Sequence, residues 1–504
     1  MNTDDRGLER RAWGVRAAGA LVGLLVLLGS AHGQVVEDYW YVVEIQGKRC
    51  GHMHASTVKD GERFVTKSVM AMSLRRGEAV VPVGLSSEFT ETAEGKPVRM
   101  RSEVKFGTMP TIDEYVFKAD GVDVSRVAGG SKTSEKKPLP EGEWMTPVAL
   151  GRFIAGKIAA GEKGFSARTI EPTVGLTPAR QTMTLLERTT LDVVGKTVPA
   201  LKWSAKNEMM PSAESTEYTD EKGVSLRSEN DIGGMRVVLV RADRAVAMAR
   251  ADPPELLEST FIRPDRQIRS PRDRTLGDYV VRSEGGPIGE WPSAGAQSVA
   301  RVDDRTLRVH VDSTACTEAT RAEIEDEAYR KPSSMINSDD AEVVRLVGLA
   351  VGDMEKEKRS ERAGRMRSYV HRFIKKKNFD VGFASAAETA RTACGDCTEH
   401  AVLLCAMLRA DGVPARCVSG LVYVDGPVPG KGFFGYHMWT QAMLAKDGKP
   451  CWLDLDAALS ETRPMDATHL AITTLSLADG ETVNALLDIL PTLGKLRVEV
   501  KSEK

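Results

Sequence analysis

The sequence predicts an α+β protein, in which an all-β N-terminal region precedes a C-terminal domain built from a cysteine-bearing helix on an antiparallel sheet. Short runs of alternating apolar and polar residues, separated by Gly, Asp and Lys turns, fill residues 34–251. From about residue 317 the pattern changes to helices with one apolar face, and strands follow from residue 415. Between these two parts of the domain, residues 395–416 combine a turn, a helix and a helix-stop signal. The remaining C-terminal elements are expected to pack around this segment.

The composition is that of an ordinary globular protein. The chain has 504 residues, of which 41% are hydrophobic and 28% are charged. Its 69 Lys and Arg residues are offset by 71 Asp and Glu residues, which leaves a net charge of −2. The length suggests about three domains, and the balanced charge argues against a basic surface for nucleic acid or anionic lipid.

The N-terminus has the pattern of an export signal. Four arginines precede an apolar run at residues 17–29, and Ala31 and Gly33 fit a cleavage site before Gln34. Residues 1–33 are therefore predicted to be a signal peptide, and the protein is expected to be periplasmic, on the cell surface or secreted. An uncleaved segment that anchors the chain in a membrane is the alternative, although the run is shorter than the roughly 20 residues of a membrane span.

Residues 34–251 are predicted to form a β-rich domain, as an antiparallel sheet, a sandwich or an open barrel. Its clearest strands are residues 39–45, 63–69, 98–104 and 234–240, and residues 146–159 are predicted to be a helix. His52 and His54 alternate on one strand face, with Cys50 nearby. They could bind a metal weakly, but without further ligands a surface or core role is the stronger interpretation.

A proline-rich break at residues 252–255 marks the next boundary. Residues 252–316 are predicted to be a small β region or linker domain, with strands at residues 279–282 and 306–311. Residues 317–504 are predicted to be the C-terminal domain. Its expected helices are residues 341–351, 359–376, a short one after a capping box at 385–388, the helix from residue 397, and 483–490. Its expected strands are residues 415–424, 437–444, 451–456 and 496–500.

The helix from residue 397 carries the candidate nucleophile in its first turn. Its apolar face repeats at helical spacing, through residues Cys397, Ala401, Leu404, Cys405 and Leu408. Gly412 is expected to end the helix in a left-handed conformation, and Pro414 prevents its continuation. The free N–H groups and the dipole at a helix N-terminus favour a thiolate, which is the nucleophilic form of cysteine.

A nucleophilic cysteine needs a base and a group that orients the base. Downstream of Cys397, His437 lies in one predicted strand and Asp456 ends the next. Neighbouring antiparallel strands bring facing side chains to about 5 Å, so a Cys397–His437–Asp456 triad is a workable arrangement. Asp454 lies on the same strand face as Asp456 and is the competing candidate.

The order of four motifs resembles the transglutaminase-like superfamily, relatives of papain-type cysteine proteases. They are Gly-Asp-Cys at 395–397, Arg-x-x-Gly-Val-Pro-Ala-Arg at 409–416, His-x-Trp at 437–439, and Trp-x-x-x-Asp at 452–456. The resemblance covers about residues 335–460. It implies Cys397 as nucleophile, His437 as general base and acid, and Asp456 as the orienting carboxylate, with Trp452 favouring Asp456 over Asp454. The family motif does not require Cys394.

Other residues near Cys397 leave alternatives open. His400 lies one turn along the helix and could rival His437, although a structural role is favoured because no group is expected to orient it. Cys394 and Cys397 form a Cys-x-x-Cys motif of the kind used in thiol–disulfide exchange, and with His400 they could form an irregular zinc site. The loop at residues 425–432 fits either a hairpin turn or a substrate lid.

The seven cysteines do not decide whether this exported chain has disulfides. An odd number leaves at least one thiol unpaired. The C-terminal domain therefore either contains disulfides around one reactive thiol or holds mostly buried apolar cysteines.

The leading hypothesis is an exported cysteine enzyme that acts on amide bonds through a thioester acyl-enzyme. Water as acceptor gives a protease or amidase, and an amine gives an acyltransferase. A protein or peptide substrate is expected, with no cofactor, metal or nucleic acid. A thiol–disulfide protein and a non-enzymatic binding module on the same fold are the alternatives.

Overall fold

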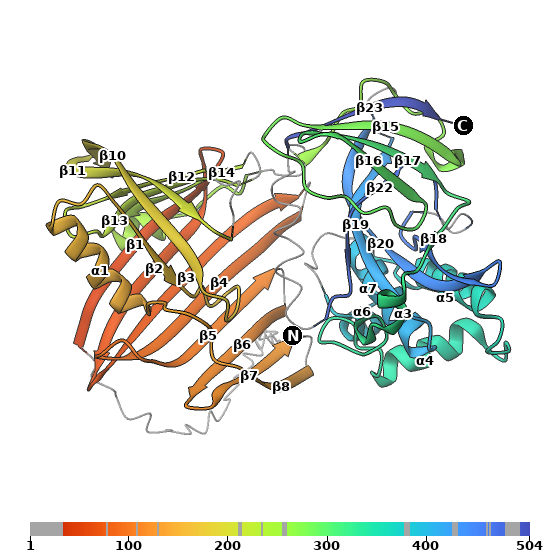
Figure 1. Cartoon of the computed structure of the whole chain (residues 1–504), viewed down its shortest axis with the longest axis horizontal. Helices are drawn as coiled ribbons and strands as arrows, with labels where there is room; N and C mark the ends of the chain where they lie inside the picture. The colour runs from red at the N-terminus through yellow and green to blue at the C-terminus, as the bar shows by residue number, and fades with distance from the viewer. Residues whose placement is uncertain are drawn as a thin grey trace, which may run out of the picture.

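The computed structural model has two lobes, an N-terminal sheet and a layered C-terminal lobe (Figure 1). It describes residues 34–76, 79–106, 109–128, 131–209, 214–232, 235–254, 260–376, 384–425, 432–459, 462, 465–478 and 494–503. The predicted signal peptide, the helix predicted at 483–490 and most of the loop at 425–432 lie outside these residues. Among the described helices, none has both the length and the apolar character needed to cross a membrane.

The N-terminal lobe is one antiparallel sheet of fourteen strands. The strands β1 to β8 form one consecutive half of the sheet, β9 to β14 form the other, and β1 pairs with β14 to join them. The bounds are β1 Gln34–Ile45, β2 Lys48–Asp60, β3 Arg63–Arg76, β4 Ala79–Thr92, β5 Pro97–Phe106, β6 Met109–Lys118, β7 Gly121–Ala128, β8 Ser131–Lys137, β9 Gly164–Thr169, β10 Ala179–Val193, β11 Lys196–Asn207, β12 Glu214–Thr219, β13 Ser225–Ile232 and β14 Met235–Ala242.

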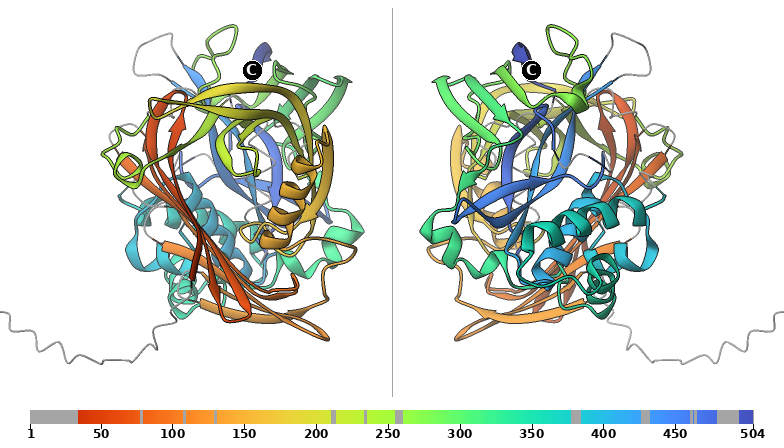
Figure 2. Two further views of the ribbon diagram at one scale, coloured as in Figure 1. Left: turned by 90° about the vertical axis from the view of Figure 1, so that its left-hand side faces the viewer. Right: turned by 90° about the vertical axis from the view of Figure 1, so that its right-hand side faces the viewer.

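The helix α1 (Pro147–Ala159) connects the two edge strands β8 and β9 of this curved sheet (Figure 2). Its C-terminal end packs through Ile158 against Trp203 of β11. At its N-terminal end, the buried Thr146 hydroxyl donates a 2.7 Å hydrogen bond to Glu91 of β4. The helix therefore ties the two halves of the sheet together. A short helix, α2 (Arg244–Ala247), follows β14.

The C-terminal lobe is built around a five-stranded antiparallel sheet of order β18-β21-β20-β19-β22. Helices pack against one end of the long strand β20, where Met438 and Ala442 lie among helical side chains. A four-stranded sheet of order β16-β17-β15-β23 packs near the start of β20, where Tyr279 of β15 contacts Phe434. The bounds are β15 Leu276–Ser283, β16 Gln297–Asp303, β17 Thr306–Asp312, β18 Thr317–Glu318, β19 Ala415–Val424, β20 Phe433–Lys446, β21 Lys449–Leu455, β22 His469–Leu475 and β23 Leu496–Glu503.

The four-stranded sheet joins segments from both sides of residue 316. Strands β15 to β17 come from the segment predicted as a small β region, and β23 comes from the end of the chain. This pairing is a long-range contact that no local sequence pattern predicts.

The described part of the C-terminal lobe contains five α-helices and two 3-10 turns. Their bounds are α3 Arg321–Glu325, α4 Ala341–Val351, α5 Arg359–Phe373, α6 Ala386–Thr392 and α7 Cys397–Ala410, with 3-10 turns η2 Pro271–Asp273 and η3 Glu327–Tyr329. The helix predicted for residues 359–376 ends three residues early. Ile374 is extended, and Lys376 instead forms a bridge with Cys394, its carbonyl accepting a 3.1 Å hydrogen bond from the N–H of Gly395. The tail of the predicted helix thus supports the loop before α7.

The fold class predicted from the sequence is confirmed, with an all-β N-terminal region and a C-terminal domain of helices on an antiparallel sheet. Some observed strand boundaries differ from the predicted ones by a few residues. The strand predicted from His437 begins at Phe433, and the strand predicted to end at Asp456 ends at Leu455.

Candidate active site

Cys397 is the first residue of α7, and local hydrogen bonds hold it there. The Asp396 side chain accepts from the N–H groups of Thr398 and Glu399, and the Glu399 carboxylate accepts from the N–H of Asp396, which completes a capping box. Gly395 has a φ of +147°, and a Cβ at this position would lie 2.4 Å from the Glu399 side chain. Glycine is therefore required where the chain turns into the helix.

A hydrogen bond between α7 and the central sheet fixes the position of the helix relative to β20. The buried Thr440 hydroxyl of β20 donates a 2.9 Å hydrogen bond to the carbonyl of Ala401, one turn after Cys397. Three residues before Thr440 on the same strand lies His437. The Cys397 thiol interacts with the His437 ring closely enough to raise the pKa of the imidazole. The helix start and the strand thus bring these two predicted site residues together.

Asp456 lies just after β21 and accepts a 2.9 Å hydrogen bond on its Oδ2 from Nε2 of His437. Two side chains of α5 hold the backbone at this point. Arg367 donates to the carbonyl of Asp456 at 3.1 Å, and His371 donates to the carbonyl of Ala457 at 2.8 Å. All three predicted site residues therefore lie in one cluster, although they are separated by up to 59 positions along the chain.

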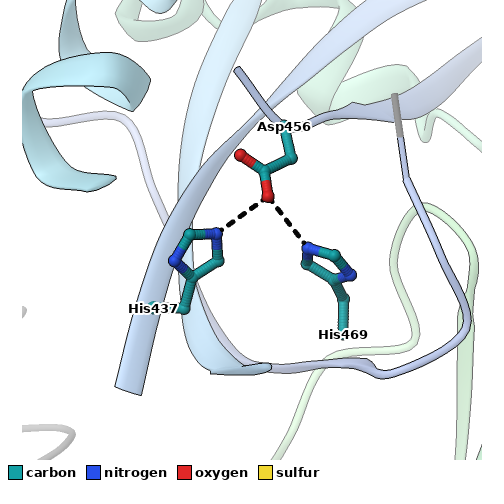
Figure 3. A group of neighbouring side chains, drawn as sticks. All are labelled: His437, Asp456 and His469. Carbon is teal, nitrogen blue, oxygen red and sulfur yellow. Dashed lines mark hydrogen bonds and ion pairs between the residues drawn. The ribbon is translucent and has the colours of Figure 1, made fainter. Parts of the chain in front are cut away.

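A second histidine, His469, contacts the same carboxylate oxygen (Figure 3). Its Nε2 lies 3.1 Å from Asp456 Oδ2, and its Nδ1 lies 3.1 Å from the carbonyl oxygen of Asp466. None of the motifs in the sequence includes His469. The spacing of Asp466 and His469, three residues apart after the Asp456 motif, is the one local signal, and it has no defined meaning until the fold places β22.

The charges of this cluster reinforce one another. Burial lowers the pKa of His437, but the charge of Asp456, its hydrogen bond and the Cys397 thiol raise it to about 9. Burial raises the pKa of Asp456, but the charges and hydrogen bonds of His437 and His469 hold it well below its usual range. Against burial, the charge of Asp466 and the hydrogen bonds to both aspartates raise the pKa of His469 to about 9. At neutral pH the cluster is therefore expected to contain two imidazolium ions and two carboxylates.

These pKa values predict a pH-dependent stability. A histidine whose pKa rises on folding from about 6.5 to about 9 stabilises the protein fully below pH 6.5. That stabilisation is lost as the pH rises through 9. We expect the free energy of unfolding from urea titrations to fall by about 1–3 kcal/mol between pH 6.5 and 9. The double variant His437→Gln/His469→Gln should have a flatter profile, and a wild-type profile that rises over this range would contradict the prediction.

Asp454, the competing carboxylate, has other partners. Its Oδ1 accepts from Trp439 Nε1 at 2.7 Å and from Gln441 Nε2 at 2.8 Å, and its Oδ2 accepts from the N–H of Ala296 at 2.7 Å. Burial raises the pKa of Asp454, although these hydrogen bonds oppose the shift. Asp454 thus links β20 to the four-stranded sheet, and Asp456 is the carboxylate that reaches His437.

Trp439 encloses the two histidines. Its ring stacks on His437 with centroids 6.1 Å apart, and it meets His469 edge to face at 5.2 Å. The side chains of His437, Asp456 and His469 are 4%, 4% and 1% exposed, whereas Cys397 is partly exposed. The ion pairs therefore lie in a low-dielectric environment, and Cys397 lies at the partly exposed edge of the cluster.

The other residues near Cys397 are placed differently. Nδ1 of the buried His400 lies 2.5 Å from the carbonyl oxygen of Asp396, which gives it a structural contact at the helix start. The Cys394 thiol donates to the carbonyl of Thr392. All seven cysteines are free thiols, and Cys50, Cys405, Cys417 and Cys451 are buried. Two pairs of these thiols lie in hydrogen-bond contact, Cys405 with Cys417 and Cys316 with Cys451.

One group of side chains within the described residues could hold a metal. The ligand atoms of His437, Asp456 and His469 lie within 4.8 Å of one another. In the structure, hydrogen bonds to Asp456 already occupy the facing nitrogens of both rings. Cys50, His52 and His54 do not form such a group. His54 instead bonds Asp38 at 2.7 Å and stacks on Trp40.

Comparison with known proteins supports the C-terminal part of this description. Residues 350–457 match a family model described as the transglutaminase-like superfamily. No curated protein matches the chain.

Three solved structures are similar to the chain at low identity. A β-barrel-like protein of a domain of unknown function from Brucella abortus is 11% identical, with 41% of this chain and 95% of that chain covered and a TM-score of 0.33. A protein designated a putative cysteine protease, from Cytophaga hutchinsonii, is 12% identical, with 46% and 89% covered and a TM-score of 0.28. A protein designated a putative protease, from Parabacteroides distasonis, is 10% identical, with 71% and 64% covered and a TM-score of 0.18. These TM-scores are too low to show that the three proteins share the fold of this chain.

Proposed function

From the premise that residues 350–457 form a domain of the transglutaminase-like superfamily, we propose that the chain is a cysteine enzyme that cleaves amide bonds through a thioester. The observation that carries this proposal is the Cys397 thiol at the start of α7, beside a His437 ring that bonds the buried Asp456. This is the arrangement that nucleophilic catalysis requires, because the base is within reach of the thiol and the carboxylate orients the base.

In the proposed reaction, His437 is an imidazolium ion that already holds the proton of Cys397, and the Cys397 sulfur attacks the carbonyl carbon of the amide as a thiolate. The negative charge on the carbonyl oxygen is stabilised by backbone N–H groups at the start of α7. Because Asp396 takes the N–H groups of Thr398 and Glu399, we assign the N–H of Cys397 to this role. His437 then protonates the leaving amine as the C–N bond breaks, and the thioester remains.

The second half of the reaction restores the thiol. His437 removes a proton from the acceptor, which attacks the thioester, and the sulfur leaves and is reprotonated. Water as acceptor gives a carboxylic acid, and an amine gives a new amide. Hydrolysis and acyl transfer use the same side chains. Whether water or an amine reaches the thioester decides which product forms.

We place this activity outside the cytoplasm, on a protein or peptide substrate. The support is the arginine-rich start and the apolar run at residues 17–29, which fit an export signal. The partly exposed sulfur at the edge of an otherwise buried cluster suits an amide presented by an extended chain rather than a small enclosed ligand.

Alkylation of the folded protein with iodoacetamide tests the nucleophile, with Cys394 as an internal control. Both thiols are partly exposed and lie three positions apart, so accessibility alone predicts similar labelling. We expect Cys397 to react at least about tenfold faster than Cys394 at pH 6, because the thiolate is the reactive form. Peptide mass spectrometry measures both rates.

Two further results belong to the same test. His437→Gln should slow the alkylation of Cys397 and leave that of Cys394 unchanged. Equal rates for the two thiols in the wild-type protein would overturn the proposed function. A peptide-library screen against wild-type and Cys397→Ala protein then identifies the amide substrate.

A further inference from the structure

The ring of His469 has hydrogen-bond acceptors at both nitrogens, and Figure 3 shows the one at Nε2, the Asp456 carboxylate. Nε2 faces Asp456 Oδ2 at 3.1 Å, while Nδ1 faces the carbonyl oxygen of Asp466 at 3.1 Å and its Oδ1 at 3.3 Å. A neutral imidazole has one N–H and one lone pair, so one of these contacts would place two lone pairs against each other. Both contacts are favourable only when the ring carries two N–H groups, which makes His469 an imidazolium ion.

The surroundings of His469 stabilise this charge. Asp466 is held by the Thr468 hydroxyl at 2.6 Å and by Arg272 of η2 at 2.6 Å. The charges therefore alternate from Arg272 through Asp466, His469 and Asp456 to His437. A buried charge requires such pairing, because an isolated one would be neutralised.

We propose that His469 is a positioning residue for the reaction of Cys397. As a buried cation, it holds Asp456 ionised and turned toward His437, and it sets the pH range in which Cys397 and His437 react. This inference rests on the proposed function, because it assigns a role in the chemistry of the same site.

The sign of the effect follows from charge alone. The titratable groups around His469 are Asp454 on β21, Asp456 just after it, Asp466 before β22, His437 on β20 and Arg272 on η2. Removing a cation makes it harder for each neighbour to lose a proton. Without the charge of His469, the Cys397 thiol and the His437 imidazolium should both release their protons at higher pH.

His469→Gln isolates the charge from the hydrogen bond, since a glutamine amide can still donate to Asp456. The matched control is His310→Gln, which removes a histidine from a surface contact with Asp278, where the two side chains are 48% and 49% exposed. The readout is the rate of alkylation of Cys397 by iodoacetamide from pH 4 to pH 10, followed by peptide mass spectrometry.

We expect both midpoints of the wild-type rate profile to move to higher pH in His469→Gln. The His437 midpoint should move by about one pH unit, because the rings of His437 and His469 are 5.7 Å apart. The midpoint of Cys397 should move less, in the same direction, and His310→Gln should overlay the wild-type profile. A His469→Gln profile that is lower at every pH but keeps its midpoints would overturn the inference and assign His469 a structural role.

The outcomes separate this inference from the proposed function. If wild-type Cys397 reacts no faster than Cys394, the proposed function fails and the inference fails with it. If wild-type Cys397 is selectively reactive and the midpoints of His469→Gln do not move, the inference alone fails.

A second measurement is made on the wild-type protein and uses variants only to assign its signals. Nitrogen-15 spectra of histidine-labelled wild-type protein distinguish an imidazolium ring from either neutral tautomer. The His469 signal is assigned from single His→Gln variants, by elimination if necessary. It should keep imidazolium shifts at pH 7.5, and a neutral ring at that pH would overturn the inference.

Discussion

Replacing Asp456 with asparagine is expected to lower kcat/KM by about 10³–10⁴-fold, the size of effect seen when a buried triad carboxylate is made neutral. Oδ2 of Asp456 accepts from Nε2 of both His437 and His469. An asparagine amide has the same size but carries no charge, and its NH₂ group cannot accept from either ring. The His437 imidazolium loses its counter-ion and its preferred orientation. The measurement is the turnover of the amide substrate identified by the library screen.

Asp454→Asn is the matched control for this prediction. Asp454 is also buried and lies two residues away, but it accepts from Trp439, Gln441 and Ala296. We expect this change to lower thermal stability and to reduce kcat/KM by less than about tenfold, because it acts on the packing of β20. If Asp454→Asn abolished turnover and Asp456→Asn did not, the assignment of the two carboxylates would be reversed.

Replacing Arg409 with methionine is expected to lower the free energy of unfolding by about 3–5 kcal/mol, since it leaves buried polar groups unpaired. Arg409 lies near the end of α7 and is 5% exposed. Its guanidinium donates to the carbonyls of Ala415, at the start of β19, and Ser476, just after β22, at 2.6–3.0 Å. It also donates to the carbonyl of Lys331 at 2.9 Å. Methionine fills similar space but makes none of these bonds.

Arg345→Met is the control for Arg409→Met. Arg345 lies on α4 with a side chain that is 55% exposed, and it pairs with Glu342 one turn earlier. An exposed pair of this kind contributes less than about 1 kcal/mol. Urea denaturation of both variants measures the difference. Equal losses would show that the carbonyl contacts of Arg409 do not stabilise the joint between α7 and the sheet.

Local patterns predicted the elements whose stabilising contacts are close in sequence. The helix α4 begins and ends where its cap and apolar spacing indicate, at Ala341 and Val351. The helix α7 begins at Cys397 because the capping contacts lie within four residues of it. The predicted end of α5 was wrong. The residues after Phe373 pair with the loop before α7, which lies about twenty positions away in the sequence.

The residues of the candidate site likewise include some that local motifs predicted and a choice that only tertiary contacts made. Cys397, His437 and Asp456 were identified from the sequence because each stands in a motif with its own residue types and spacing. Asp454 and Asp456 share a strand face, so alternation alone could not separate them. In the structure, Asp454 accepts a hydrogen bond from Ala296, next to the four-stranded sheet, whereas Asp456 accepts one from His437.

By itself, the sequence determined the order of β and α regions, the helix that presents Cys397, and the three residues proposed for acyl transfer. Side-chain period, capping and motif spacing are local properties, which the chain carries before it folds. Only the tertiary structure decided the strand order, the pairing of β23 with β15, and the position of His469 against Asp456. These depend on which distant segments bury their apolar faces together, and no local spacing encodes that choice.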